Sequence, residues 1–222
     1  MRKSVSRNGL ILAVFAMATS GLIALTYFAT HEQIALQQQA KLQGILNAII
    51  APGSYDNAIA NNCINVISSE FLGTNEPQRI YRALNNKLPV GVAIETTAPD
   101  GYSGKIQLVV GLTDDGQGNV IISGVRVLEH KETPGLGDKI DLRVNDWILS
   151  FTQILFTPET SERFAVKKDG GQFDQFTGAT ISPRAVVKAV KRSALYYQQE
   201  KQAIFSAANA CSLDALNAPE TN

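Results

Sequence analysis

A long apolar run occupies the first thirty residues. Arg2, Lys3 and Arg7 precede an uncharged stretch whose apolar centre extends from Gly9 to Phe28. As an α-helix this centre would be about 30 Å long, which matches the hydrocarbon core of a bilayer. Because basic residues beside a span stay on the cytoplasmic side, the pattern predicts a single-pass anchor with a cytoplasmic N-terminus and all later residues outside.

A cleavable signal peptide is the alternative interpretation of this run. Arg2–Arg7 would be its basic region and Gly9–Phe15 its apolar region, followed by the cleavage site Ala16-Met17-Ala18. The apolar residues continue to Phe28, well past that site, which favours a retained anchor. Both interpretations place the following domain outside the cytoplasm.

Beyond the span, apolar residues recur at helical spacing from His31 to Ile50, and Pro52-Gly53 predicts the end of this helix. We expect a stalk that packs on the domain, although a partner helix could share its apolar face. The chain is therefore divided into an N-terminal segment with anchor (1–30), a helical stalk (31–52) and a globular domain (53–222).

The middle of the chain has the pattern of an antiparallel sheet. Two hairpins are predicted, each from a pair of β-prone segments around a turn. The first pairs Arg79–Leu84 with Val90–Thr97 around Asn85-Asn86-Lys87, and the second pairs Lys105–Leu112 with Val120–His130 around residues 114–118. Alternating apolar residues predict one buried and one wetter face.

The last third of the chain predicts helices around a short strand. Leu142–Leu155 has helical periodicity, and Arg163–Lys167 is predicted to be a strand. A final helix is expected to begin at Ser182 as N-cap, with Pro183 at the first helical position. The fold class is therefore α+β: one N-terminal transmembrane helix, then a globular domain with an antiparallel sheet and flanking helices.

Charge and cysteine content narrow the function. The formal net charge is zero, which argues against nucleic acid as a partner. Cys63 and Cys211 lie in no metal-binding pattern, and His31 and His130 are too few and too distant for a histidine site, so no metal is expected. Outside the cytoplasm the cysteines either form one disulfide or remain two unrelated thiols.

Two glycine-containing segments could together hold a ligand. Residues 174–183 place small side chains directly before a helix N-terminus, where free backbone N–H groups favour an anion. His130–Asp138 joins a strand to the next element and could wrap a flat, polar-edged ligand. Lys167 and Lys168 could add positive charge near a phosphate. Taken alone, each segment is also compatible with an ordinary capped loop or turn.

The first segment carries a specific motif. Asp174-x-x-Thr177-Gly178-Ala179-Thr180-x-Ser182 matches D-x-x-(S/T)-G-A-T-x-(S/T), the pattern at which a flavin transferase attaches FMN to a threonine. Together with the anchor, Asp100–Gly104 and Glu132–Gly137, it makes nearly the whole chain resemble the G subunit of the Rnf/Rsx ion-translocating electron-transport complex, a family with an FMN-binding domain.

This resemblance implies a covalent flavin site. The Thr180 hydroxyl would attack the flavin-bearing phosphorus of FAD and form a phosphodiester, so that the chain becomes a phosphoprotein. Asp174 would serve in recognition or deprotonation, Thr177 and Ser182 as phosphate or loop-capping donors, beside the small Gly178 and Ala179. The residues expected to line the isoalloxazine or ribityl chain are Glu132, Thr133, Gly135 and Leu136.

The resemblance also implies partners and a place. The chain would be an electron-transfer subunit of a translocase in the bacterial inner membrane, with a periplasmic domain, beside other subunits that move electrons between ferredoxin and NAD. It has neither a nicotinamide fingerprint nor an iron–sulfur motif, so it would be incomplete alone and have no catalytic residues of its own. Two alternatives are the equivalent subunit of the Na+-translocating NADH:quinone oxidoreductase and a periplasmic assembly or sensor module.

Overall fold

A single long helix dominates the N-terminal part of the chain. The computed structural model describes residues 2–211 and contains two compact units, Met1–Leu42 and Gln43–Asn222. Helix α1 (Arg2–Ile49) is continuous, so the predicted anchor and stalk are one element. Its segment Arg7–His31 has a mean hydropathy of 2.1 and is fully exposed, and it is long and apolar enough to cross a membrane.

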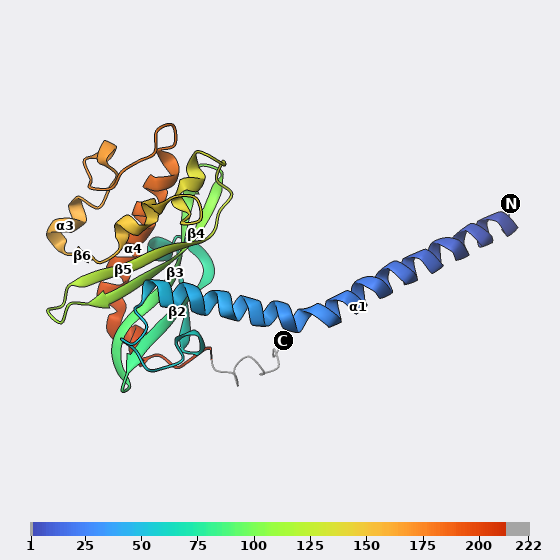
Figure 1. The fold of residues 1–222 in the computed structure, drawn as a ribbon, viewed down its shortest axis with the longest axis horizontal. Coiled ribbons are helices and arrows are strands. Elements are labelled where there is room, and N and C mark those ends of the chain that lie inside the picture. The colour runs from blue at the N-terminus through green and yellow to red at the C-terminus, as the bar shows by residue number, and fades with distance from the viewer. Residues whose placement is uncertain (1, 212–222) are drawn as a thin grey trace. The chain divides into compact units, whose positions relative to one another are not determined.

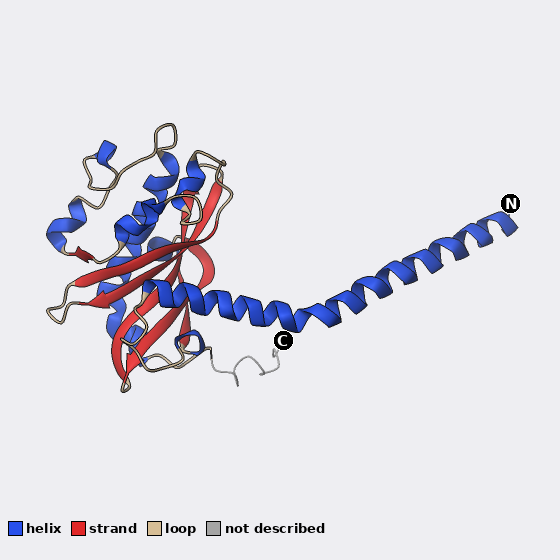
Figure 2. Cartoon of the chain, viewed as in Figure 1, coloured by secondary structure: helices blue, strands red, loops and turns tan. Residues whose placement is uncertain are grey.

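A six-stranded antiparallel sheet forms the centre of the second unit (Figure 2). Its spatial order follows the sequence, from β1 to β6. The strands are β1 (Cys63–Ser68), β2 (Thr74–Asn85), β3 (Leu88–Gly101), β4 (Gly104–Asp114), β5 (Val120–Glu129) and β6 (Ile154–Phe156). Both predicted hairpins are confirmed. Asn86 and Lys87 turn the first one with φ of 50° and 65°, as a two-residue turn between twisted strands requires.

One face of the sheet is covered by the last helix, α4 (Ile181–Ser206), which runs across β3, β4 and β5 (Figure 1). Its buried residues recur at helical spacing, from Val186 through Val190 to Ala194. Opposite them, alternate strand residues such as Ile94 and Leu108 complete the core. The remaining helical segments are short: α2 (Ser69–Leu72), α3 (Pro158–Glu162), and the 3-10 turns η1 (Ile59–Asn61), η2 (Gly137–Ile140), η3 (Asp146–Phe151) and η4 (Lys167–Asp169).

The other face of the sheet is not the wetter face that the alternation predicted. Gly111 and Gly124 are paired residues of β4 and β5, and Ile49 at the end of α1 lies against both. The hydroxyl of Ser123 donates a hydrogen bond to the Ile49 carbonyl. Because these glycines have no side chains, the backbone of α1 approaches the sheet closely. With α4 on the opposite face, the middle of the sheet is buried on both sides.

Three local predictions are wrong. Leu142–Leu155 is not a helix: it contains η3, capped by the Asn145 side chain, and then the start of β6, which pairs with β5. The predicted strand Arg163–Lys167 contributes only one isolated bridge, between Val166 and Phe173. In the first segment, pairing with β5 overrides the local pattern. In the second, the backbone groups bond to the nearby residues Gln172 and Phe173, so no sheet strand forms.

The third wrong prediction concerns the start of the last helix. α4 begins at Ile181, so Thr180 occupies the N-cap position and Ser182 lies inside the first turn. Pro183 is accommodated there because first-turn amides have no intrahelical acceptor to lose. The Ser182 hydroxyl is buried and is used for a tertiary contact described below.

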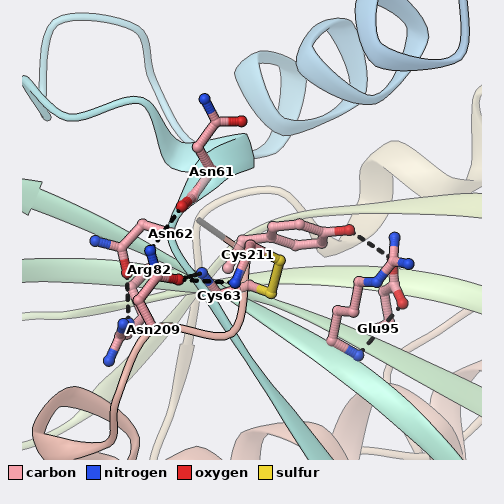
Figure 3. Close-up of a disulfide and its surroundings, with 9 residues drawn as sticks. Asn61, Asn62, Cys63, Arg82, Glu95, Asn209 and Cys211 are labelled. Atoms are coloured by element: carbon pink, nitrogen blue, oxygen red, sulfur yellow. Dashed lines mark hydrogen bonds between the residues drawn. A yellow bond between two sulfur atoms is a disulfide. The ribbon is translucent and has the colours of Figure 1, made fainter. Parts of the chain in front are cut away.

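A disulfide joins β1 to the segment that follows α4 (Figure 3). Cys63 on β1 and Cys211 are 148 residues apart in sequence, with a Cα–Cα distance of 5.1 Å. The Asn209 side chain accepts the backbone N–H of both cysteines at 3.0 Å. The buried Arg82 guanidinium donates to the carbonyl of Ala207 at 2.6 Å. Of the two alternatives for the cysteines, the structure therefore has the disulfide.

Candidate functional site

A cavity of about 240 Å³ lies at the N-terminal end of α4. It is formed where three segments meet: the turn between β3 and β4, the loop after β5 and the segment that leads into α4. Its lining is mostly small or apolar. The lining residues are Tyr102, Thr133, Leu136, Gly137, Gly178, Ala179, Thr180, Ile181 and Ser182.

Thr180 is placed in this cavity by the backbone before α4. Gly178 has a φ of +82°, a conformation that residues with side chains rarely adopt, and it turns the chain so that the Ala179 N–H donates to the Phe176 carbonyl at 3.1 Å. Thr180 follows at the N-cap position. Within the described residues no side chain caps this helix end, so its first N–H groups have neither a capping nor an intrahelical partner.

An aromatic cluster packs against residues 173–176, the first part of the segment that leads to Thr180. The Trp147 indole N–H donates to the Asp174 carbonyl at 2.8 Å, and its ring meets those of Phe151 and Phe176 edge to face, with centroids 5.4 and 5.3 Å apart. Phe151 also stacks on Phe173 at 4.4 Å. Such aromatic contacts add to the free energy of burial, so the path of residues 173–176 is fixed by the core.

Two ion pairs bracket the same loop. Lys167 Nζ lies 2.6 Å from Asp174 Oδ1, and Arg184 Nε lies 2.6 Å from Asp169 Oδ2. Hydrogen bonding from Arg184 lowers the pKa of Asp169. The Asp174 side chain is 68% exposed, so the first carboxylate of the motif points to solvent at the surface of the loop.

Glu132 lies behind the other side of the cavity and is 5% exposed. Its Oε1 accepts the backbone N–H of Ser103 at 3.0 Å, and its Oε2 accepts the Ser182 hydroxyl. Gly137 passes so close that a Cβ atom there would lie 2.6 Å from Oε2. The carboxylate is thus enclosed by protein groups from three segments.

The loop that carries Glu132 is closed at its base by contacts of Asp141 with His130 and Arg143. His130 Nε2 lies 3.5 Å from Asp141 Oδ2, and Arg143 forms hydrogen bonds to both oxygens of the same carboxylate. Hydrogen bonding from Arg143 is the main reason that the pKa of the buried Asp141 is lowered. These contacts join residues 130 and 141, so the two ends of the loop between them lie close together.

The structure gathers part of the predicted site. Thr133, Leu136 and the stretch 178–180, with Ser182, line one cavity. Glu132, Gly135, Asp174 and Thr177 do not line it, although Glu132 reaches it through Ser182. Tyr102, Gly137 and Ile181 also line the cavity and were not among the predicted site residues. Of these, Ile181 could have been found from the sequence. Its signal was its place in the motif, since the first residue of a helix points back toward the loop that precedes it.

This arrangement suits a phosphorylated ligand with a flat ring. A helix N-terminus with unpaired N–H groups and a positive dipole end favours a phosphate. Tyr102, Leu136 and Ile181 are between 42% and 67% exposed and offer an apolar rim. Gly178 and Ala179 leave the backbone accessible beside the Thr180 hydroxyl. The residues present therefore fit a ligand that has a phosphate and a flat ring, as FMN has.

Comparisons with known proteins show the family of this chain. A family model described as FMN-binding domain matches residues 101–194, which include every residue that lines the cavity, and one described as RnfG N-terminal region matches residues 1–49. Relatives named as the G subunit of an ion-translocating oxidoreductase complex come from several bacteria. That of Pseudoalteromonas atlantica is 59% identical over 95% of this chain and 96% of its own length.

Two further relatives with this name extend the comparison. The protein of Shewanella piezotolerans is 46% identical over 96% of this chain and 99% of its own length. That of Vibrio cholerae is 48% identical over 95% of this chain and 99% of its own length. Since these matches span both the N-terminal helix and the FMN-binding region, the chain belongs to the RnfG family, the G subunits of ion-translocating oxidoreductase complexes.

Proposed function

We propose that this chain is an electron-transfer subunit of an ion-translocating oxidoreductase complex and carries FMN esterified to Thr180. The observation that carries the proposal is the position of Thr180, at the N-cap of α4 in a cavity with an apolar rim. The flavin attachment motif supports the choice of this hydroxyl, and membership of the RnfG family supports the role in electron transfer.

Attachment is the work of a second protein, a flavin transferase. The Thr180 oxygen attacks the flavin-bearing phosphorus of FAD, the bond between the two phosphates breaks, AMP leaves and the hydroxyl proton passes to a base. Phosphoryl transfer depends on positioning and charge stabilisation more than on covalent catalysis. A hydroxyl beside a helix N-terminus suits such a step, because the unpaired amides can stabilise phosphate charge.

After attachment the chain's own residues hold and orient the flavin. When bound, FMN supplies one- and two-electron transfer. The helix end would bind the phosphodiester, Tyr102, Leu136 and Ile181 would contact the ring, and Thr133 would donate or accept at its polar edge. Because no group of the chain needs to react, the protein contributes location, orientation and environment.

We further infer a single-pass inner-membrane protein with residues 1–30 as N-terminus and anchor, 31–52 as stalk and 53–222 as a periplasmic FMN-binding domain. Basic residues before the span support this orientation. The disulfide supports it too, since such bonds persist in oxidising compartments and are rare in the cytosol. The coupled reaction is then the ferredoxin–NAD exchange of the resembled complex, and its other redox centres lie on other subunits.

The covalent bond is tested by co-expression of the full-length chain with a flavin transferase. After denaturation, wild type should keep about one flavin per chain, seen as fluorescence on the gel band and as a mass increase equal to FMN less water. Thr180→Val should lose both signals, because it keeps the shape of the side chain and removes the oxygen. Thr177→Ser, the matched control in the same loop, keeps the hydroxyl that the motif requires at this position and should still carry covalent flavin.

Two outcomes would contradict the proposal. One is a wild-type chain that binds no covalent flavin under conditions in which the transferase modifies a known acceptor. The other is a Thr180→Val chain that retains the flavin, which would assign the linkage to a different residue. Peptide mapping of the modified band identifies that residue.

A further inference from the structure

Both oxygens of the Glu132 carboxylate are engaged by protein groups in the structure. They accept from Ser103 and Ser182, residues that are 29 and 50 positions away in sequence. Hydrogen bonds to a charged acceptor are stronger than those between neutral groups, and breaking one inside a protein is costly. A direct contact with the flavin ring would compete with these two bonds.

These two bonds join the three segments that build the cavity. Ser103 belongs to the turn between β3 and β4, next to the lining residue Tyr102. Ser182 belongs to the first turn of α4, two residues after Thr180. Glu132 itself precedes the lining residue Thr133. One buried side chain therefore links the turn, the loop and the helix end that presents the attachment hydroxyl.

Two glycines make room for this link. A Cβ atom at Gly137 would lie 2.5 Å from Ser182 Oγ and 2.6 Å from Glu132 Oε2, and one at Gly101 would lie 3.0 Å from Glu132 Oε1. The distances at Gly137 are shorter than any normal contact, so a larger residue there would displace the carboxylate. The backbone is thus fitted around Glu132 from both sides.

We propose that Glu132 is a positioning residue for flavin attachment: its carboxylate ties Ser103 to Ser182 and so holds the first turn of α4, with Thr180, against the cavity. This inference rests on Thr180 being the attachment site. Glu132 then acts on the attachment site through Ser103 and Ser182, whereas the family resemblance implies that it contacts the cofactor directly.

The test compares Glu132→Ala, Glu132→Gln and the control Glu129→Ala, an exposed carboxylate three residues earlier. Full-length chains are incubated with FAD and limiting flavin transferase, and the rate of covalent loading is measured. We expect loading to slow about tenfold or more in Glu132→Ala. Glu132→Gln should recover most of the rate, because its carbonyl can accept from Ser103 while its amide donates to the Ser182 oxygen. Glu129→Ala should match wild type.

Amide hydrogen exchange before flavin addition gives a readout that does not depend on loading. Glu132→Ala should lose protection at the Ser103 amide, which donates to Glu132, and at the Arg184 amide, which donates to the Thr180 carbonyl and is the first hydrogen-bonded amide of α4. The central residues of β4 and the distal half of α4 should stay protected. A merely destabilised chain would lose protection throughout. If Glu132→Ala does not fold, Ser182→Ala replaces it, and it should lose protection only at the Arg184 amide while Ser103 stays protected.

Two results would overturn the inference. The first is a Glu132→Gln chain that loads as slowly as Glu132→Ala with Ser103 and α4 still protected, which would mean that the negative charge acts directly. The second is a Glu132→Ala chain with unchanged exchange at both places. Failure of the proposed function is distinguishable, because it appears as the absence of covalent flavin on wild type, while the exchange measurements still report on the link.

Discussion

At the residue scale, most of the site depends on what surrounds each side chain. Thr180 and Thr177 are chemically identical hydroxyls in one loop, yet only Thr180 lines the cavity. Asp174 and Glu132 are both carboxylates of the predicted site, and one is mostly exposed while the other is 5% exposed. Residue type alone thus identified candidate residues. Burial and hydrogen-bond partners then distinguish the surface carboxylate of Asp174 from the buried carboxylate of Glu132, which joins two segments.

Gly137 provides a prediction at this scale. Gly137→Ala should destabilise the globular unit by about 1–3 kcal/mol, because the added methyl group overlaps Ser182 Oγ and Glu132 Oε2. Denaturant unfolding of the full-length chain measures this loss. Gly44→Ala is the control, since no atom lies within 4 Å of its Cβ position and alanine favours a helix, so it should be neutral or slightly stabilising. Equal stability of the two variants would contradict the packing around Glu132.

At the scale of elements, the sheet is built from local hairpins, and the cavity is built from the turn and loops that connect the strands and from the start of the last helix. The cavity lies beyond the ends of β3, β4 and β5, where the β3–β4 turn and the loop after β5 meet the start of α4. The loop after β5 keeps its shape through the contacts of Asp141 with His130 and Arg143. These contacts stabilise a segment that has little regular structure of its own.

Asp141 makes the stability of this loop depend on pH. Its pKa in the folded chain is lowered, chiefly by hydrogen bonding from Arg143, so it binds fewer protons folded than unfolded. Its contribution is therefore complete above the unfolded pKa of about 4 and is lost as the pH falls through the lower folded value. Asp141→Asn should be less stable than wild type at pH 7, and the difference should shrink as the pH falls below about 4. A gap that is constant with pH, measured by denaturant unfolding at each pH, would contradict this role.

At the scale of the whole chain, two segments outside the sheet, the end of α1 and residues 207–211, are attached to it. The final turn of α1 lies on the glycine pair of β4 and β5, and the segment after α4 is joined to β1 by the disulfide. Arg82 adds to this second attachment, since its guanidinium donates to the carbonyls of Ile204 and Ala207 at the end of α4. The end of α1 and the segment 207–211 are therefore part of the packed structure of the globular unit.

The disulfide gives a prediction about stability and location together. When the chain is taken from cells and treated with an alkylating reagent before reduction, neither cysteine should be alkylated. After reduction, two thiols should react with the reagent. Cys63→Ala should lose up to about 5 kcal/mol of stability, the chain-entropy value for so long a loop. Cys211→Ala should lose a similar amount, because either change removes the same bond. Free thiols in the chain before reduction would contradict a domain in an oxidising compartment.

Much of the fold could be predicted because its signals are local. The apolar run of α1, the turn at Asn86-Lys87 and the alternation in β4 each depend on a few neighbouring residues. The errors lie where distant partners decide: β6 exists because β5 offers an edge, and Ser182 leaves the capping position because Glu132 accepts its hydroxyl. The residues that stay outside the cavity, Asp174 and Thr177, could not be separated from Thr180 by motif alone.

The sequence by itself determined the apolar N-terminal helix, the two hairpins, the final helix and the motif around Thr180, because periodicity, turn residues and spacing are properties of short segments. Only the tertiary structure decided that the sheet is buried on both faces, that Cys63 meets Cys211, and that Glu132 is tied to Ser103 and Ser182. Each of these joins groups from 29 to 148 residues apart, and no local pattern encodes such a meeting. It arises when the packed core brings those segments together.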